Sequence, residues 1–331
     1  MYAFAIWVTT GCNLECSYCY EGKKKETISL NVQNADRIVE FIKETSESTK
    51  ETIIIDFHGG EPLLNYPIIK YIIECLEKTG NKYVYGITTN GTIYSKEIRE
   101  FLINNFSYSL TVSLDGTKKA HNKNRIFKNG NPTYDIALKT ALDLLEKRPD
   151  IRIRMTVVPN NIKELSEGII TLIEYGFKII VPALDYFDSN WTQYDMEILK
   201  NELKKIKVYI SRFNGDTDIQ IGMLNCRKQK LNKCSGGIYA FHIVPNGDIY
   251  PCAYSVGVKE EKIGNVISGL DTQKIEILKA IYESQNEKCA GCDNYEFCIS
   301  SRCKILNQKV MGSYNEPIPV ICAEENVKRN I

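Results

Sequence analysis

The stretch AFAIWVTTGCNLECSYCY, residues 3–20, joins an apolar run to three closely spaced cysteines. The run at residues 3–9 predicts a buried strand. Cys12, Cys16 and Cys19 follow it at the spacing C-x3-C-x2-C, which allows three thiolates to close on one iron–sulfur cube. Three protein ligands leave the fourth iron open, so the sequence predicts that a cofactor binds there.

This cysteine motif resembles the signature of the radical S-adenosylmethionine enzymes. It directly follows a strand-like run near the N-terminus, and the aromatic Tyr18 precedes its last cysteine. The resemblance implies a 4Fe-4S cluster on Cys12, Cys16 and Cys19, with S-adenosylmethionine (SAM) chelating the open iron. One electron would then split SAM into methionine and a 5′-deoxyadenosyl radical, which the protein places and shields. Taken alone, the same thiols also suit a zinc knuckle.

Composition and charge narrow the class of protein. The chain has 331 residues, enough for one large domain and a smaller one, and its 42 lysines and arginines balance 41 acidic residues. No charged field therefore favours nucleic acid or a membrane surface. We expect a cytoplasmic protein, because residues 1–10 lack signal-peptide features and no apolar run could span a bilayer. In a reducing compartment, twelve cysteines indicate metal binding or catalysis rather than disulfides.

Short β-branched runs alternate with amphipathic helical stretches along residues 1–190. The predicted strands are Ala3–Thr9, Thr52–Phe57, Tyr83–Thr88, Tyr108–Leu114, Ile151–Val158 and Lys178–Ala183. The predicted helices are Val32–Glu44, Ile68–Lys78, Lys96–Asn104, Tyr134–Lys147 and Lys163–Tyr175. Six successive β-α units require a parallel sheet with right-handed crossovers. The predicted fold class is therefore α/β, with a partial (β/α)6 barrel similar to a TIM barrel.

Ligands bind such sheets at the carboxyl ends of the strands. After the second predicted strand comes His58-Gly59-Gly60-Glu61-Pro62, where paired glycines permit close backbone approach and a carboxylate follows. It resembles the Gly-Gly-Glu-Pro segment that holds the SAM amino group in this family, which implies a cofactor-binding role for Gly59, Gly60, Glu61 and Pro62. A plain glycine turn is the alternative.

The next two strand ends also resemble SAM-contacting segments of the family. Thr88 and Asn90 close the third strand, and Ser113 and Asp115 close the fourth. We expect Arg125 to bind the SAM carboxylate, because a guanidinium can grip it with two bonds. Asn-Gly and Asp-Gly are also ordinary turn pairs. For the nearby His121 a structural role is favoured.

Residues after the sixth strand face the side where a substrate would enter. Asp185, Tyr186 and Asp188 are candidate substrate contacts there. A helix over Asp195–Phe213 with one apolar face then leads out of the barrel. We expect a barrel domain over residues 1–190, a helical linker over 191–225 and a cysteine-rich auxiliary domain over 226–331.

Eight cysteines gather in the last third of the chain. Ala240–Val244 and Asp248–Pro251 flank Asn246-Gly247, which predicts a β-hairpin that delivers Cys252. The arrangement C-x12-G-x4-C, C-x2-C-x5-C-x4-C and C-x18-C is similar to the SPASM extension of radical SAM enzymes that modify peptides. That family usually has three residues where this chain has four between Cys298 and Cys303.

The SPASM resemblance implies two auxiliary 4Fe-4S clusters. The first would be held by Cys226, Cys234, Cys252 and Cys303, and the second by Cys289, Cys292, Cys298 and Cys322. If Cys226 does not ligate, the first cluster has an open iron that a substrate thiol could bind. A pair of zinc sites is the alternative. The remaining Cys75 is predicted to be a buried, inert thiol.

One departure from the family narrows the predicted function. Anaerobic sulfatase maturases carry an acidic residue directly after the cysteine that matches Cys252, whereas this chain has Ala253. We therefore expect a maturase that forms a thioether cross-link in a ribosomally made peptide. Peptide epimerisation, carbon–carbon cross-linking and sulfatase-maturase-like oxidation are alternatives within the family. A non-catalytic iron–sulfur or zinc protein is the alternative from another class.

The expected partners follow from this function. They are a precursor peptide, an external one-electron reductant of the flavodoxin or ferredoxin type, and a stand-alone leader-peptide-binding protein. The last is expected because no leader-binding domain precedes the first strand; an exposed sheet edge or the barrel mouth are the other candidate recognition sites.

Overall fold

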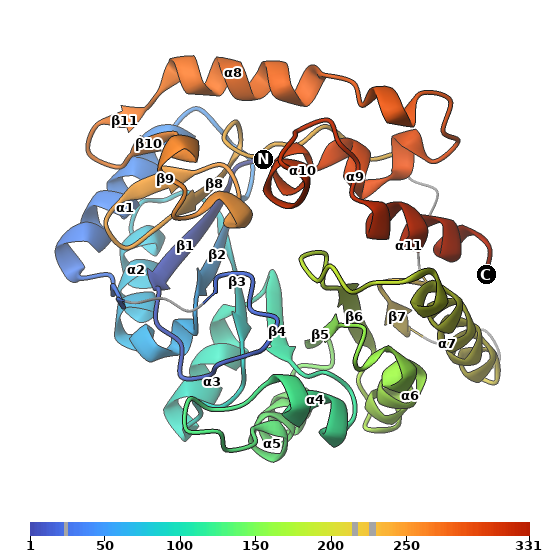
Figure 1. The fold of residues 1–331 in the computed structure, drawn as a ribbon. Coiled ribbons are helices and arrows are strands. Elements are labelled where there is room, and N and C mark those ends of the chain that lie inside the picture. Colours follow the sequence, from blue (N-terminus) through green and yellow to red (C-terminus); the bar gives the residue numbers. More distant parts are fainter. Residues whose placement is uncertain (23–25, 214–217, 225–229) are drawn as a thin grey trace.

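The computed structural model describes residues 1–22, 26–213, 218–224 and 230–331, arranged as Figure 1 shows. The strands of the N-terminal part are β1 (Ala3–Thr9), β2 (Ile53–Gly59), β3 (Tyr83–Thr89), β4 (Ser109–Ser113), β5 (Arg152–Val157) and β6 (Ile179–Leu184). Its helices are α1 (Val32–Ser46), α2 (Tyr66–Glu77), α3 (Lys96–Asn105), α4 (Lys118–Asn124), α5 (Tyr134–Leu145), α6 (Leu165–Glu174) and α7 (Gln193–Ser211).

Strands β1 to β6 lie side by side in chain order, and each pairs with the next in parallel. Helices cover the outside of this curved sheet (Figure 1). The α/β partial barrel predicted from the sequence is thus confirmed. The prediction missed α4, which is only seven residues long.

Alternation of side chains along β2, β4 and β5 separates an apolar outer face from a polar inner face. In β2, Ile53, Ile55 and Phe57 are fully buried against the helices. Between and after them, Asp56 and His58 point to the inside of the barrel, where both remain partly exposed. The outer residues hold the fold together, and the inner ones are available for chemistry.

The predicted hairpin is present and extends the barrel sheet. β8 (Ala240–Ile243) and β9 (Asp248–Tyr250) are antiparallel, and Gly247 takes the left-handed φ of 84° that their turn requires. β8 also pairs in parallel with β1. With β7 (Gln220–Ile221), β10 (Gly264–Asn265) and β11 (Gly269–Leu270), the described residues form one eleven-stranded sheet.

Aromatic packing joins the two parts of the chain at this seam. The ring of Phe241 in β8 stacks on that of Phe4 in β1, with centroids 5.6 Å apart. Phe41 of α1 meets Phe241 edge-on at 6.3 Å. All are buried, so the barrel and the C-terminal part share one hydrophobic core.

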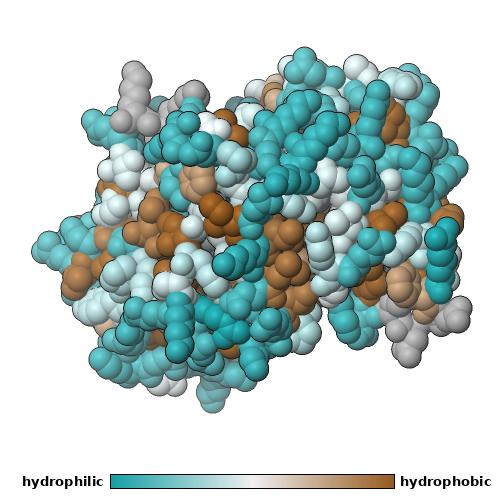
Figure 2. Space-filling view, turned by 90° about the horizontal axis from the view of Figure 1, so that it is seen from below, coloured by the Kyte–Doolittle hydropathy of each residue, from teal (hydrophilic) through white to brown (hydrophobic). Residues whose placement is uncertain are grey.

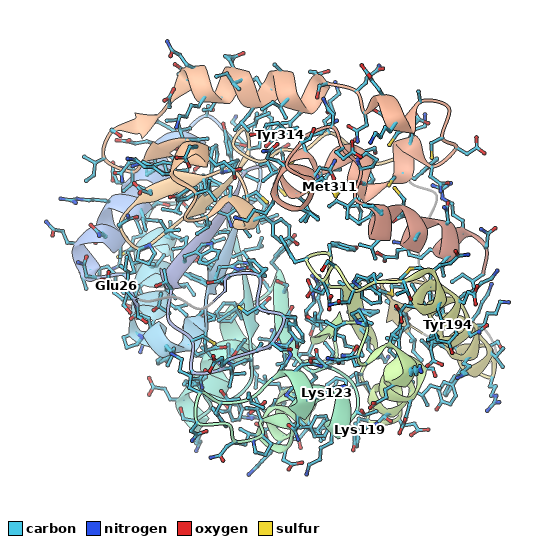
Figure 3. All side chains as sticks on the ribbon, in the orientation of Figure 1. Glu26, Lys119, Lys123, Tyr194, Met311 and Tyr314 are labelled. Carbon is cyan, nitrogen blue, oxygen red and sulfur yellow. The ribbon has the colours of Figure 1, made fainter. Side chains whose placement is uncertain are left out.

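Four helices follow the hairpin in the C-terminal part: α8 (Thr272–Glu283), α9 (Ile299–Arg302), α10 (Lys304–Met311) and α11 (Pro319–Arg329). A second apolar cluster of Cys298, Leu306, Ile318 and Ile321 lies among them, and Met311, labelled in Figure 3, packs against it. The buried Lys304 donates to the side-chain oxygens of Asn286 and Asn315, so its charge is hydrogen-bonded.

The surface shows no large apolar face on the side seen in Figure 2, where hydrophobic patches are bordered by hydrophilic side chains. Lys119 and Lys123 of α4, labelled in Figure 3, reach Glu164 and the carbonyl of Asn160 at 2.9 and 3.3 Å. Among the described residues, no helix combines the length and apolar character needed to cross a membrane.

Candidate active site

The cysteine loop after β1 is hydrogen-bonded to the last residue of α4 and to the segment that follows this helix. The amide of Glu15 donates to the carbonyl of Ile126 at 2.8 Å, and the amide of Ser17 donates to the carbonyl of Asn124 at 2.9 Å. The Ser17 hydroxyl also donates to Oδ1 of Asn124 at 2.8 Å. These bonds fix the loop at the carboxyl end of the parallel strands, where such folds place their sites.

The thiols of this loop lie close enough to influence one another. Burial raises the pKa of Cys16 to about 11, the guanidinium of Arg125 opposes this, and Cys12 and Cys19 add to it. Burial also raises the pKa of Cys12, whose sulfur accepts from the Leu14 amide at 3.4 Å. Three neighbouring thiols with an adjacent cation and an amide donor fit an iron–sulfur cluster.

Gly59 and Gly60 let the end of β2 lie directly against the cysteine loop. A Cβ at Gly59, whose φ is 148°, would lie 2.2 Å from the carbonyl oxygen of Thr9. A Cβ at Gly60 would lie 2.3 Å from the carbonyl oxygen of Gly11. The amide of Glu61 donates to that same Gly11 oxygen at 2.9 Å. The close approach predicted for a ligand is therefore made, in this structure, by the cysteine loop itself.

Glu61 is 1% exposed and accepts three hydrogen bonds from the protein. They come from the Thr89 hydroxyl at 2.8 Å, the Asn90 amide at 2.7 Å and the Leu63 amide at 3.1 Å. Burial raises the pKa of Glu61 to about 7 although these donors favour the carboxylate. The side chain thus ties the end of β2 to the end of β3, with Pro62 beginning a short helical turn. A contact of this segment with SAM stays a prediction.

Asn90 lies beside the first cysteine. Its Nδ2 is 3.9 Å from the Cys12 sulfur and donates to Oδ1 of Asn13 at 2.9 Å. Its Oδ1 accepts from the hydroxyl of Thr92 at 2.6 Å. Thr88 is in register with Thr111 of β4 and shares its inward face.

The side chain of Asp115 is buried and forms hydrogen bonds with the cysteine loop, with the end of α4 and with β5. Its Oδ2 accepts from Nε of Arg125 at 3.0 Å and from the Tyr18 hydroxyl, and its Oδ1 accepts from the Thr156 amide at 2.9 Å. The Arg125 guanidinium also lies 5.2 Å from the centre of the Tyr18 ring. The structure therefore pairs Arg125 with Asp115, and the expected grip on a SAM carboxylate stays a prediction. Ser113, buried at the end of β4, belongs to the same region.

His121 has the structural role favoured by the sequence. It is 1% exposed, its Nδ1 accepts from the Asp115 amide at 3.3 Å, and its Nε2 lies 2.9 Å from the Thr133 hydroxyl. Burial lowers the pKa of His121 to about 4 against the opposing charge of Asp115. The imidazole is therefore neutral at physiological pH.

The described cysteines of the first predicted auxiliary set lie near one another. Burial raises the pKa of Cys252 to about 12, and the adjacent Cys303 and Cys234 raise it further. Tyr282, whose hydroxyl donates to the carbonyl of Gly236 at 2.9 Å, lies next to these thiols. Cys226, the fourth member of the predicted set, lies outside the described residues.

The second predicted set of cysteines also converges. Burial raises the pKa of Cys322 to about 11, and Cys298, Cys289 and Cys292 all contribute. Where the chain is described, no group of three histidine, cysteine or acidic side chains is arranged to hold a single ion. A 4Fe-4S cube instead takes one thiolate at each iron. The left-over Cys75 is only half-buried, so the predicted full burial is wrong.

A cavity of about 100 Å³ opens between the cysteine loop and the C-terminal part. It is lined by Trp7, Tyr20, Glu21, Phe187, Ala253, Tyr254, Val256 and Lys309. The wall therefore combines residues next to Cys19, next to Cys252 and after β6. Of the candidate substrate contacts, Tyr186 instead donates to Glu324 of α11 at 2.8 Å, and Asp185 and Asp188 accept from nearby loop amides.

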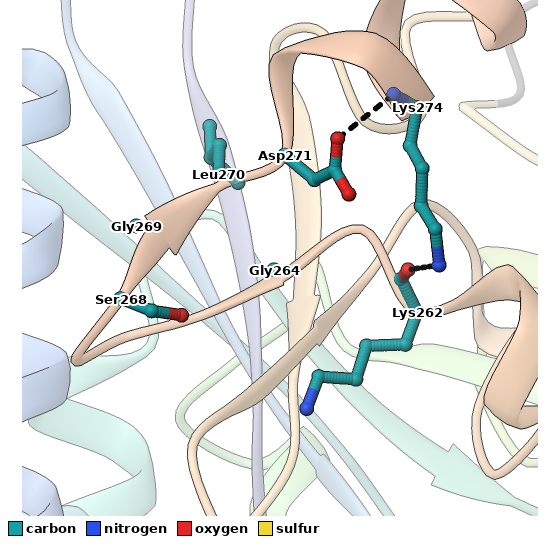
Figure 4. Close-up of a pocket in the computed structure, with 7 residues that line it drawn as sticks. All are labelled: Lys262, Gly264, Ser268, Gly269, Leu270, Asp271 and Lys274. Atoms are coloured by element: carbon teal, nitrogen blue, oxygen red, sulfur yellow. Dashed lines mark hydrogen bonds between the residues drawn. The ribbon is translucent and has the colours of Figure 1, made fainter.

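A second hollow, of about 250 Å³, lies between β10, β11 and the start of α8 (Figure 4). Its lysines are already engaged: Lys274 donates to the carbonyl of Lys262 at 2.7 Å, and Lys262 pairs with Asp248 at 2.5 Å. Asp271 caps α8 by accepting from the Lys274 amide at 3.1 Å. This hollow contains none of the predicted site residues.

Sequence reasoning missed the polar inner face of the barrel. Pairing registers put Asp56, His58, Thr111, Arg154 and His242 on this face, beside the predicted Thr88. The signal was present in β2, where aspartate and histidine alternate with large apolar residues. The signal is obscured because His58 also adjoins the Gly-Gly-Glu-Pro segment.

A parallel barrel with three thiols at the end of its first strand defines a class of enzymes that bind a cluster at the barrel mouth. The chain belongs to the Radical SAM superfamily, which matches residues 6–188. Its homologues are enzymes, and this membership implies SAM and one 4Fe-4S cluster as cofactors.

Curated relatives cover most of the chain. An uncharacterized protein of Methanocaldococcus jannaschii is 28% identical over 89% of this chain and 95% of its own length. A cysteine-type anaerobic sulfatase-maturating enzyme of Clostridium novyi is 23% identical, over 88% of this chain and 85% of its own. The mycofactocin maturase MftC of Mycolicibacterium smegmatis is 22% identical, over 88% and 75%. These relatives confirm the resemblance to SPASM-type peptide maturases.

Solved structures share the fold. Native anSMEcpe with bound AdoMet and Cp18Cys peptide superimposes with a TM-score of 0.80, at 20% identity over 99% of this chain and 95% of that one. Streptococcus suis SuiB bound to precursor peptide SuiA gives 0.70, at 19% identity over 97% and 75%. The agreement extends into the C-terminal part, so the α/β barrel with its C-terminal extension is a shared architecture.

Proposed function

We propose that this radical SAM enzyme is a maturase that forms an intramolecular thioether in a ribosomally made precursor peptide. The observation that carries the proposal is the cavity in which Tyr20 and Glu21, beside Cys19, meet Ala253, beside Cys252. A peptide residue held there would lie between the cluster-binding thiols of the cysteine loop and the first auxiliary set. Relatives that act on peptides or sulfatases support the substrate class.

The residues of the barrel mouth fit the cofactors. Cys12, Cys16 and Cys19 would hold the cluster, and bound SAM would supply a 5′-deoxyadenosyl radical that abstracts a substrate hydrogen. The chain itself fixes the geometry: Asp115 orients Arg125 and Tyr18 beside Cys16, and Asn90 lies against Cys12. Cys12 and Cys16 are partly buried among these residues, and Cys19 is exposed.

Ala253 favours cross-linking over thiol oxidation. Formylglycine formation requires a base at this position in sulfatase maturases, and an alanine side chain accepts no proton. In this chain, position 253 forms part of the cavity wall. A small apolar residue leaves space for a second substrate group beside the first.

The auxiliary thiols would hold two further 4Fe-4S clusters that accept the surplus electron. Anaerobically reconstituted enzyme should then contain about 12 iron atoms per chain. Replacing Cys289 and Cys292 by alanine should remove about 4 of them while SAM cleavage continues. A chain that still holds all its iron after this change would contradict the assignment of the second set.

The function is tested with reduced enzyme, SAM and a cysteine-rich peptide encoded beside its gene, supplied with flavodoxin or ferredoxin and any neighbouring leader-binding protein. Thioether formation predicts a mass loss of about 2 Da per link, since two hydrogens leave. Peptide of unchanged mass that gains solvent deuterium would instead indicate epimerisation. Absence of both changes, with 5′-deoxyadenosine released, would refute a role in modifying this peptide.

A further inference from the structure

Asp56 and His58 form a hydrogen-bonded pair on the inner face of β2. Nε2 of His58 lies 3.0 Å from Oδ2 of Asp56, and their side chains are 26% and 30% exposed. Gly86 of β3 makes room for this pair, because a Cβ there would lie 2.5 Å from Oδ1 of Asp56. The pair is therefore built into the barrel wall while remaining accessible from inside it.

Aromatic residues fix the orientation of the His58 ring. The Trp7 ring stacks on it with centroids 5.9 Å apart and an interplanar angle of 23°. Nε1 of Trp7 donates to Nδ1 of His242 at 3.3 Å, and the His242 ring lies 6.0 Å from that of His58. Trp7 also lines the 100 Å³ cavity, so the His58 ring packs against one residue of the wall of the proposed substrate site.

The charge of Asp56 determines which nitrogen of His58 can accept a proton. A carboxylate at Nε2 keeps the ring hydrogen on that nitrogen, which leaves the lone pair on Nδ1. Burial lowers the pKa of His58, but the hydrogen bond and charge of Asp56, with Glu21 adding, leave it above its ordinary value. Burial lowers the pKa of His242 to about 3, so that neighbouring ring stays neutral.

We infer that His58, oriented by Asp56, is the proton acceptor for the substrate thiol that becomes the thioether sulfur. This inference rests on the proposed function and names a base for it, since position 253 supplies none. In the step, the S–H bond breaks and sulfur keeps the electron pair. The proton forms an N–H bond at Nδ1, and Asp56 offsets the positive charge of the resulting imidazolium.

Protonation of His58 can be followed without any substrate, because the chain has only three histidines. Anaerobic holoenzyme is carbethoxylated with diethylpyrocarbonate from pH 5 to 9, and the modification at each histidine is measured by peptide mass spectrometry. Only neutral imidazole reacts, so the midpoint reports the pKa. We expect a midpoint for His58 above 6.5 that falls in Asp56→Asn, where burial is opposed only by the smaller influence of Glu21.

Asp135→Asn is the matched control, because it removes an exposed aspartate that pairs with Lys118 on the outer surface. It should leave the His58 midpoint unchanged. If Asp56→Asn also leaves the midpoint unchanged, Asp56 does not set the protonation of His58 and the inference fails.

Cross-linked peptide and 5′-deoxyadenosine are measured separately, so that a failure of this inference can be told from a failure of the proposed function. In His58→Gln we expect cross-linked peptide to decrease by about 100-fold or more, while 5′-deoxyadenosine release stays within a factor of about 3 of the parent. Raising the pH should increase cross-linking in the parent, and the midpoint should move to lower pH in Asp56→Asn. Full cross-linking by His58→Gln would overturn the inference. A parent enzyme that never modifies a thiol-containing peptide would overturn both it and the proposed function.

Discussion

Gly60 lies so close to the cysteine loop that even a methyl group would displace it. In Gly60→Ala the new Cβ would meet the Gly11 carbonyl and the Cβ of Cys12 at 2.9 Å or less. We expect a loss of about 1–3 kcal/mol in the free energy of unfolding. The iron bound by the first three cysteines should fall with it, because the loop must shift. Urea unfolding and iron analysis measure the two effects.

Gly222→Ala is the control for this prediction. Its new Cβ would meet its nearest neighbour, Val181, at 3.5 Å, an ordinary contact. The control should therefore keep both its stability and its iron. Equal behaviour of the two variants would show that the cysteine loop can move away from the end of β2.

His121 gives the protein a stability that depends on pH. Its pKa of about 4 in the folded state lies below the ordinary 6.5, so between these values the unfolded chain binds more protons. The contribution is complete above pH 6.5 and is lost as the pH falls toward 4. We expect about 2 kcal/mol of this loss between pH 6.5 and 5. Urea titrations of the parent and His121→Asn should show a smaller loss in the variant.

At the scale of residues, the sequence identifies the chemistry but not the orientation of polar side chains. Three closely spaced cysteines and a Gly-Gly-Glu-Pro segment can be recognised because their spacing is local. That Asp115 binds Arg125, Tyr18 and the Thr156 amide could not be foreseen, because these partners come from three separate elements. The pairing of Asp56 with His58 is local to β2, so the alternation of that strand could have indicated it.

At the scale of elements, Tyr186 connects the loop after β6 to α11. Its hydroxyl donates to Glu324, which is 3% exposed. In Tyr186→Phe this buried carboxylate loses a donor, at a cost of about 1–3 kcal/mol. We expect faster hydrogen exchange in α11 and little change in β1. Tyr194→Phe, at a position 63% exposed, should leave exchange in α11 unaffected.

The periodicity of the chain predicted β1 to β6 to within a few residues, since these strands are regular and buried. It missed α4, whose seven residues are too few to show a helical period. This short helix nevertheless positions the segment that holds the cysteine loop. Hydrophobic periodicity therefore predicts the long strands of the barrel better than the short helix beside the cysteine loop.

At the scale of the whole molecule, the shared sheet should make the barrel and the C-terminal part unfold together. Phe241→Ala removes the ring that packs on Phe4 and Phe41, and we expect a loss of about 3–5 kcal/mol. Hydrogen exchange in β2 and in β8 should reach the unfolded level at the same urea concentration. Separate transitions would show two independent units.

Ile277→Ala on the outer face of α8 is the control for this change. The side chain is 59% exposed, so its removal should change stability by less than about 0.5 kcal/mol. The pairing of β8 with β1 itself could not be predicted, because no local pattern in either strand specifies a partner so far along the chain.

The position of β1 in the sheet also affects how the protein is made. Trp7 in β1 and His242 in β8 are bonded across 235 residues of chain. At a translation rate of about 5–20 residues per second, β8 is synthesised on the order of tens of seconds after β1, so one edge of β1 stays unpaired for that time. The sheet on that side of β1 is therefore completed only near the end of synthesis, whereas the segments bonded to the cysteine loop, which extend to Ile126, leave the ribosome much earlier.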